Sequence, residues 1–232
     1  MMCRMTVAVI VVLMCMGGVA WAGDIVAMPT GNMVPQGQYE AHYIYWDMDS
    51  IPTPGGTVRE HLNVLEFFAG VTDDLEIDVL SLWPQGLDDI QEVNVYYRVL
   101  EETPLKPSLI VGATNVTGEN WLPSTERPGP IGDTRVSPFV LGSYNIMVPQ
   151  GGPPSLRNPL VRLHLGYGTN FHEDKPFGGM QILVHPALGA GIFNYQGQPV
   201  YLVACMPRPD IEIHLGWGQG DPLLHLGYHG SF

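Results

Sequence analysis

The sequence predicts an all-β fold, an antiparallel up-and-down transmembrane β-barrel of about twelve strands (10–12). Three observations predict it. Apolar and polar residues alternate with a period of two in segment after segment, and no helical period persists. Most of these segments reach the ~9–11 residues that a tilted strand needs to cross a bilayer. Aromatic residues gather at strand ends, whereas a β-sandwich concentrates them in mid-strand between its sheets.

The composition excludes several kinds of partner. The chain has 232 residues, with 10 basic and 23 acidic side chains and a formal net charge of −13. Because a nucleic-acid-binding surface needs clustered Lys and Arg, we expect no nucleic-acid partner. The apolar content of 45% can bury a large surface, which argues against disorder, and the length fits one domain.

The first segment, 1–22, is typical of a cleaved signal peptide. Arg4 precedes an apolar run from Met5 to Met16, and Ala20-Trp21-Ala22 supplies the small residues that a signal peptidase reads. A membrane anchor is the alternative, but the run is shorter than the ~20 residues that a spanning helix needs. Cleavage would leave Cys205 as the single cysteine of the mature chain, so we expect no intramolecular disulfide.

We expect the mature chain to consist of an extended periplasmic segment, 23–37, followed by the barrel, 38–232. Alternation along the barrel predicts twelve strands, of which the eighth and ninth are the weakest. Their ranges are 38–47, 57–69, 74–83, 91–101, 107–116, 135–147, 159–168, 178–185, 188–195, 199–207, 210–217 and 222–232. Short and long connections largely alternate between them, as expected of a barrel with tight periplasmic turns and longer external loops.

The polar positions of each strand are expected to face the barrel interior. In the last strand, for example, Leu224 and Leu226 alternate with His225, so we interpret the leucines as lipid-facing. The lumen-lining candidates are Arg59, His61, Asn63, Glu76, Asp78, Asn94, Arg98, Arg162, His164, Glu212, His214, His225 and His229. Glu66 falls on the outward parity of its strand, where a charge facing lipid is costly. We therefore expect either a bulge there or a position at the membrane interface.

Aromatic side chains are expected to form belts at the two membrane interfaces. The interface aromatics are Tyr39, Trp46, Phe67, Trp83, Tyr167, Trp217, Tyr228 and Phe232. The terminal Phe232 shares a face with Tyr228, as in the C-terminal strand by which the barrel-assembly machinery recognises outer-membrane barrels. We therefore expect the cell outer membrane as the location, and its lipid and the assembly machinery as partners.

A short motif, aliphatic-His-Leu-Gly-aromatic, occurs three times, at 163–168, 213–218 and 224–229. In each copy the inward His is expected to fill the lumen with a polar group, while the inward Gly leaves room for neighbours. If the last two strands pair with His214 opposite His225, these rings are adjacent, and a transition-metal site is the alternative to hydrogen bonding. No further residues complete a coordination set at a recognisable spacing, so we expect no metal and no cofactor.

Catalysis is not expected of this chain. His229 and Ser231 lie two apart on one strand face, which resembles the His-x-Ser of outer-membrane phospholipases. Alternation turns both residues inward, however, whereas the phospholipase site faces outward, and no neighbouring Asn or Asp is fixed to orient the His. An esterase is therefore only an alternative, and no Gly-x-Ser-x-Gly or Walker motif occurs in the sequence.

The start of the mature chain, 23–40, resembles the opening of YjbH-like outer-membrane proteins. The matching residues are Gly23, Met28, Pro29, Thr30, Met33 and Gly37. The resemblance implies an outer-membrane β-barrel associated with exopolysaccharide production or export, here as a short member with one barrel. It also implies polysaccharide or export components as partners, and it carries over no catalytic residue.

The expected function is therefore a structural or transport-accessory role in the outer membrane, in exopolysaccharide production or export. Two alternatives stay open at this point. One is a soluble exported β-sandwich that binds a ligand, and the other is a passive channel for small solutes. In the first alternative, the alternating apolar residues would meet a second packed sheet instead of lipid.

Overall fold

The computed structural model describes most of the chain. The described residues are 32–53, 56–84, 90–117, 136–169, 174–195, 198–218 and 221–232. For 48–53, 56–62, 82, 84, 90, 195 and 198 the description covers the backbone and not the side chains. The predicted signal peptide lies outside these residues. Among the described residues no helix is long and apolar enough to cross a membrane, a finding that does not concern strands.

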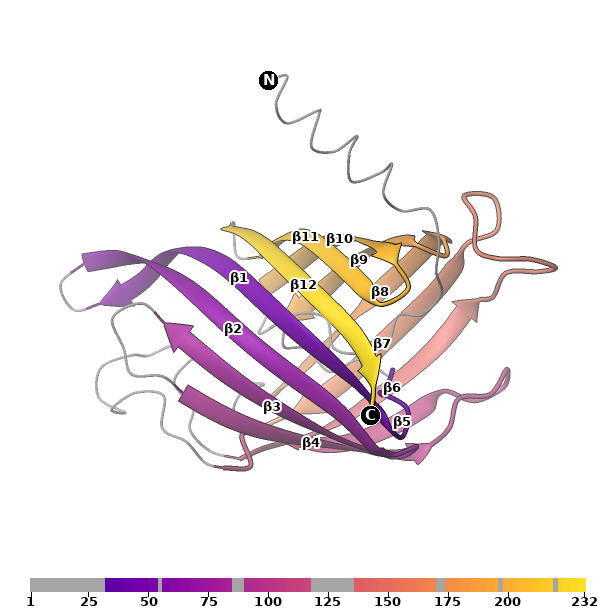
Figure 1. Ribbon diagram of the computed structural model, residues 1–232, viewed down its shortest axis with the longest axis horizontal. Coiled ribbons are helices and arrows are strands. Elements are labelled where there is room, and N and C mark those ends of the chain that lie inside the picture. Colours follow the sequence, from indigo (N-terminus) through magenta and orange to yellow (C-terminus); the bar gives the residue numbers. More distant parts are fainter. Residues whose placement is uncertain are drawn as a thin grey trace, which may run out of the picture.

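Twelve strands form one antiparallel sheet that closes into a barrel (Figure 1). They are β1 (Gln38–Thr53), β2 (Gly56–Thr72), β3 (Leu75–Pro84), β4 (Ile90–Leu100), β5 (Ser108–Thr114), β6 (Ser137–Met147), β7 (Leu160–Gly168), β8 (Lys175–His185), β9 (Leu188–Tyr195), β10 (Gln198–Arg208), β11 (Ile211–Gly218) and β12 (Asp221–Ser231). Each strand pairs with its neighbours in sequence, and the indigo β1 closes the sheet on the yellow β12. The predicted up-and-down barrel is confirmed, and a single closed sheet replaces the alternative of two packed sheets.

The first hairpin extends further than the sequence predicted. The segment 48–56 had the polar, Pro-containing character of a loop, but the ladder continues to the pair Thr53↔Gly56. The register shifts between Met48 and Ile51, which marks a β-bulge or similar irregularity. Because a bulge absorbs an irregular stretch and lets the pairing resume, β1 and β2 are longer than alternation alone indicated.

The connections at one end of the barrel are mostly tight. We call this end, where β1 begins and β12 ends, the turn end, and the opposite end the loop end. Two-residue turns at 73–74, 186–187 and 209–210 join successive strands at the turn end. The longer connections there, 101–107 and 148–159, each contain an isolated β-bridge.

The two faces of the sheet differ in chemistry. In β12 the inward side chains of Leu223 and His225 are 3% and 0% exposed. The next side chain, Leu226, faces outward and is 40% exposed. The exposed outer face is apolar over many strands and includes Leu65, Val79, Tyr97, Val140, Leu165, Ile192, Tyr201, Val203 and Leu215. Since water would not stabilise such a surface, this outer face is that of a barrel surrounded by lipid.

The barrel interior is filled by side chains. An apolar cluster comprises Met33, Ile44, Trp46, Val64, Leu80, Tyr96, Ile110, Phe139, Leu141, Phe177, Phe193, Val200, Leu202 and Leu223. Two glycines make room for its rings: a Cβ on Gly166 would lie 2.4 Å from Cζ of Phe177, and one on Gly218 would lie 2.7 Å from Trp46. The close approach of Phe177 explains Gly166, the glycine of the first copy of the repeated motif. In β1 and β11 the described polar interior residues lie nearer the turn end.

The segment 32–37 lies against the interior wall at the turn end. Val34 is fully buried, and its backbone N–H donates a hydrogen bond of 2.5 Å to the carboxylate of Glu76. Met33 belongs to the apolar cluster of the interior. A Cβ on Gly70 would lie 2.1 Å from the carbonyl oxygen of Pro35, so only glycine admits the segment there. This part of the predicted periplasmic segment is therefore packed onto the barrel.

Four of the predicted interface aromatics form one cluster at the turn end. The ring centroid of Tyr39 lies 5.5 Å from that of Phe67, 6.3 Å from that of Tyr228 and 5.2 Å from that of Phe232. The Tyr39 ring also covers Gly230, its cross-strand partner in β12, where a Cβ would lie 2.4 Å from the ring. Gly230 shares the outer face of the strand with Tyr228 and Phe232 but has no side chain of its own. The Tyr39 ring covers this position instead.

The remaining predicted aromatics lie toward the loop end. Trp83, Tyr167 and Trp217 are 37%, 48% and 59% exposed on the outer face. The prediction was wrong for Trp46, which is 6% exposed and packs in the interior against Gly218. Tyr45 and Trp46 are adjacent aromatics, so the ring that faces outward could not be chosen by residue type alone.

Candidate histidine–glutamate site in the barrel interior

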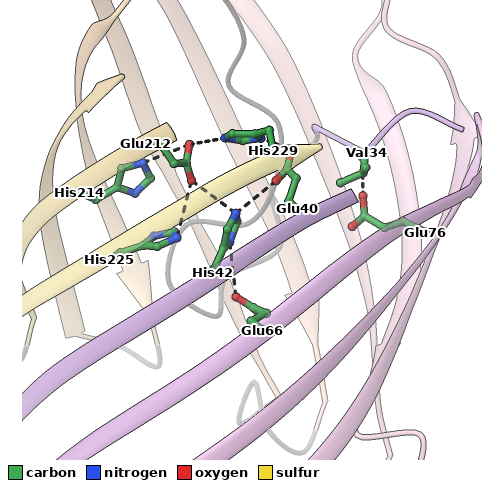
Figure 2. A network of polar contacts seen from close by, with 9 residues as sticks. All are labelled: Val34, Glu40, His42, Glu66, Glu76, Glu212, His214, His225 and His229. Atoms are coloured by element: carbon green, nitrogen blue, oxygen red, sulfur yellow. Dashed lines mark hydrogen bonds and ion pairs between the residues drawn. The ribbon is translucent and has the colours of Figure 1, made fainter. Parts of the chain in front are cut away.

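Seven ionisable side chains gather inside the barrel near the turn end (Figure 2). They come from β1, β2, β11 and β12, which are neighbours in the closed sheet. We call them the histidine–glutamate cluster, and its members are Glu40, His42, Glu66, Glu212, His214, His225 and His229. The alternation of side chains along each strand turns all seven inward. The register between the strands then places them at a similar height inside the barrel.

The strand pairing explains why these residues meet. His214 faces His225 across β11 and β12, as the sequence had suggested, and their ring centroids are 4.4 Å apart. Barrel closure then adds β1, where Glu40 faces His229 and His42 lies beside the Glu66 of β2. The site therefore exists only because the first strand pairs with the last.

Glu212 is the centre of the cluster. Its Oε1 lies 3.5 Å from Nε2 of His42 and 3.7 Å from Nε2 of His225. Its Oε2 lies 3.6 Å from Nε2 of His214 and 3.4 Å from Nε2 of His229. One buried carboxylate thus faces four imidazoles, two on each oxygen.

A glycine opposite Glu212 makes this position possible. Gly227 pairs with Glu212 in the β11–β12 ladder. A Cβ on Gly227 would lie 2.4 Å from Cγ and 2.7 Å from Oε1 of Glu212. The inward glycine of the third motif copy therefore leaves the space that the central carboxylate occupies.

The centre of the cluster is closed to water and poor in hydrogen bonds, whereas the His229 side chain at its edge is 16% exposed. The side chains of His42 and His225 are 0% exposed, and within the described part of the chain neither ring has a hydrogen-bond partner. The shortest contact in the cluster is 3.0 Å, between Nδ1 of His229 and Oε1 of Glu40. No described Lys or Arg pairs with the carboxylates of the cluster. Because buried polar groups are normally satisfied, the cluster has capacity for a further partner.

The first motif copy provides a contrast. His164 is buried in the same way, but its Nδ1 lies 2.7 Å from the hydroxyl of Ser143 and its Nε2 lies 3.1 Å from Oε1 of Gln181. Both ring nitrogens are therefore satisfied by side chains. The motif by itself predicts an inward His, whereas the neighbouring strands decide whether that His belongs to a site.

Several other lumen-lining candidates form hydrogen bonds that stabilise the barrel wall. Glu76 accepts the N–H of Val34, and Asp78 accepts a hydrogen bond of 2.7 Å from the side-chain amide of Asn94. All three acceptor and donor side chains are buried. They lie inside the barrel but outside the histidine–glutamate cluster.

Two arginine candidates lie near the turn end. Arg98 pairs with Asp74 at 2.9 Å, and Arg162 pairs with Glu102 at 2.9 Å. The Arg98 side chain is 22% exposed and the Arg162 side chain 13%. Both therefore fix the rim of the barrel, where strands and turns meet.

The predicted parity of β2 was wrong. Asn63 lies on the outer face, where its Oδ1 accepts a hydrogen bond of 2.6 Å from the hydroxyl of Tyr43. Glu66 is 1% exposed and faces inward, so neither a bulge at this position nor an interface location is needed. Both faces of β2 carry apolar residues, which left the alternation ambiguous. The candidates Arg59 and His61 lie in β2, but their side chains fall outside the described set.

Sequence reasoning did not select Glu40 and His42. The available indication was the even parity of β1, on which Glu40 and His42 alternate with the aromatic Tyr39 and Tyr43. Combining that parity with closure onto β12 would have placed both residues beside His225 and His229. Among the described residues, His42, Glu212 and His225 form a set whose ligand atoms all lie within 4.8 Å, so these three could hold a metal ion.

The architecture defines a class: a closed, antiparallel, up-and-down barrel with an apolar outer face is the fold of outer-membrane barrels. Among solved structures the chain is similar to the KdgM porin, with 12% identity and a TM-score of 0.50 over 83% of this chain and 99% of that one. An outer membrane channel from Pseudomonas putida F1 aligns at 14% identity and a TM-score of 0.43, over 90% of this chain and 100% of that one. No family model matches the sequence, and neither does any curated protein.

Proposed function

We propose that this protein resides in the outer membrane and has a structural or transport-accessory role there. The observation that carries the proposal is the combination of an apolar outer face with a closed barrel whose described interior is filled. Phe68 and His225 are 0% exposed, and Ile110 and Leu141 are 1% exposed, although all four face the interior. A wide aqueous pore would leave such side chains wet, so a scaffold or accessory role is favoured over free diffusion.

We extend the proposal to exopolysaccharide production or export, on the resemblance of 23–40 to YjbH-like proteins. Of the matching residues the structure describes Met33 and Gly37, which lie where the chain enters the barrel. Deletion of the gene should lower the amount of exopolysaccharide released, and the intact gene should restore it. Unchanged exopolysaccharide in a strain that is confirmed to lack the protein would remove this part of the proposal.

A passive channel is the second candidate, and the interior charge favours one selectivity. Apart from histidines, the buried ionisable side chains of the described residues are all acidic: Glu40, Glu66, Glu76, Asp78, Glu92, Glu212 and Asp221. Rings of carboxylates favour cations in a pore. If the interior opened, the channel would therefore pass cations or neutral solutes in preference to anions.

Two measurements separate these functions. Outer-membrane fractions should contain the protein, and unheated and boiled samples should migrate differently in detergent gels, because a closed barrel resists detergent until it is heated. In planar bilayers the filled barrel should show no steady conductance. Steady cation-selective conductance would instead favour the channel, and release by osmotic shock would contradict the membrane location itself.

A further inference from the structure

We infer that His42, Glu212 and His225 form a binding site for a divalent transition-metal ion such as Zn²⁺ inside the barrel. The three side chains come from β1, β11 and β12 and are each at most 3% exposed. The inference does not depend on the proposed role in the membrane. It rests on the geometry of the three side chains, on the absence of hydrogen-bond partners for the two imidazoles among the described residues, and on the charge around them.

The spacing of the donor atoms fits a metal better than a hydrogen bond. Nε2 of His42 and Nε2 of His225 lie 3.5 Å and 3.7 Å from Oε1 of Glu212. Hydrogen bonds from N–H to oxygen are normally about 2.7–3.2 Å long. Ligands about 2.0–2.2 Å from a tetrahedral Zn²⁺ lie roughly 3.3–3.6 Å from one another. The two contacts are therefore near the separation that a shared ion would require.

The unsatisfied imidazoles point independently to a ligand. His42 and His225 are fully buried, and both nitrogens of each ring lack a hydrogen-bond partner among the described residues. Their ring centroids are 4.5 Å apart, and both rings aim Nε2 at the same carboxylate oxygen (Figure 2). Leaving buried polar groups unpaired is costly, and coordination would offset that cost.

The local charge also favours a cation. Glu40 and Glu66 lie beside His42, at 3.4 Å and 3.8 Å, so with Glu212 three carboxylates surround the two histidines. No described Lys or Arg neutralises them. A buried carboxylate without a cation is costly, and a bound divalent ion would supply the missing positive charge.

Neighbouring side chains complete the site. Glu66 lies on the Nδ1 side of His42, the place where a carboxylate typically orients a metal-bound imidazole. Oε2 of Glu40, 3.4 Å from Nε2 of His42, is the nearest further donor for a fourth position. His214 and His229 contact the other oxygen of Glu212 and fix its orientation.

The test uses the full chain, folded in detergent without a histidine tag, freed of metal with a chelator and titrated with Co²⁺ and then with Zn²⁺. We expect one ion per chain, with the intense visible absorption of tetrahedral Co²⁺ that disappears when Zn²⁺ displaces it. His225→Gln and Glu212→Gln should each weaken affinity at least tenfold, since even outer-shell partners change it by about 10–100-fold. His164→Gln is the matched control, because it removes a buried motif histidine outside the cluster, and its affinity should equal that of the wild type.

Folding of each variant is checked by its heat-dependent migration in detergent gels. If a cluster variant does not fold, Cu²⁺ bound to the wild-type chain decides, because its electron paramagnetic resonance spectrum should show coupling to two nitrogens. A folded wild-type chain that binds no stoichiometric ion would overturn the inference. So would equal loss of affinity in His164→Gln and His225→Gln, and the cluster would then be a metal-free ion-pair network.

Discussion

At the scale of single residues, the position of Glu212 depends on the space left by Gly227. The two residues are paired across β11 and β12, and the carboxylate lies where any side chain on Gly227 would begin. The same relation recurs at Gly166 with Phe177 and at Gly218 with Trp46. The interior is therefore assembled from large side chains fitted over glycines, and small changes at these glycines should have large effects.

Gly227→Ala should destabilise the barrel by about 1–3 kcal/mol, the usual cost of inserting a methyl group into a packed interior. The added Cβ would displace Glu212 and with it the contacts to four imidazoles. The free energy of unfolding, measured by denaturant titration of protein folded into vesicles, provides the readout. Gly142→Ala is the control, because the nearest atoms to its Cβ would be 3.8 Å away, and it should change stability little. Equal stability of the two variants would contradict this account of Gly227.

The residues that sequence reasoning misplaced share one physical cause. Alternation identifies the two faces of a strand but tells which is inner only when one face is clearly apolar. In β2 the inward Val64 and Phe68 are as apolar as the outward Leu65 and Phe67, so Glu66 was assigned to the wrong face. A barrel that is filled rather than wet inside weakens the contrast on which the parity of a strand depends.

At the scale of elements, the turn end is held together on both faces of the sheet. Outside, Tyr39 stacks on rings from β2 and β12 and lies near Phe232, while inside the segment 32–37 packs against β2 and β3. Two backbone hydrogen bonds of 3.0 Å, from Gly37 to Gly70 and from Phe232 to Gly37, join the three parts. The seam between the first and last strands is therefore reinforced where the chain enters and leaves the barrel.

Tyr39→Ala should cost about 1–3 kcal/mol of stability, because each aromatic pair contributes about 0.5–1.5 kcal/mol beyond its area burial. The substitution also uncovers Gly230. Tyr201→Ala is the matched control: Tyr201 is an outward tyrosine that is 52% exposed and has no ring partner among the described residues. Unfolding in vesicles should show the larger loss for Tyr39→Ala, and the reverse order would argue against a reinforced seam.

Gly70→Ala should release the segment 32–37 from the interior wall. A Cβ at this position cannot coexist with the carbonyl oxygens of Val34 and Pro35, which would lie 2.4 Å and 2.1 Å from it. Limited proteolysis followed by mass spectrometry should therefore detect faster cleavage before residue 38 in this variant than in wild type. Gly142→Ala should be cleaved at the wild-type rate, and equal protection of Gly70→Ala would show that the segment is held in another way.

Element order and strand limits were readable from the sequence where alternation was clean, as in β7, β11 and β12. The ends of β1 and β2 at their hairpin could not be read from the sequence, because a bulge lets the strand pairing continue through residues that are typical of a loop. The histidines of β11 and β12 were found for the same reason that their strands were. Glu40 and His42 needed the pairing of β1 with β12, which is a property of the closed barrel and not of any one strand.

At the scale of the whole molecule, closure unites the apolar outer face, the filled interior and the histidine–glutamate cluster. An open sheet would leave the edges of β1 and β12 unpaired in lipid, where unsatisfied backbone groups are very costly. Closing the sheet satisfies these groups and, in the same step, assembles the cluster from the two ends of the chain. A barrel closed in this way in a membrane requires that its outward apolar positions contact lipid.

Nitroxide labelling in phospholipid vesicles tests that requirement most directly. Single cysteines would replace outward Val203 and Leu224 and inward Ala204 and Leu223. The starting chain would lack residues 1–22, which contain Cys3 and Cys15, and would carry Ser in place of the buried Cys205. We expect labels at the outward pair to collide readily with oxygen, which concentrates in the acyl region, and poorly with a water-soluble nickel chelate. The inward pair should be shielded from both. Labels at Val203 and Leu224 that meet the nickel chelate as readily as a label in water would contradict the lipid-facing barrel.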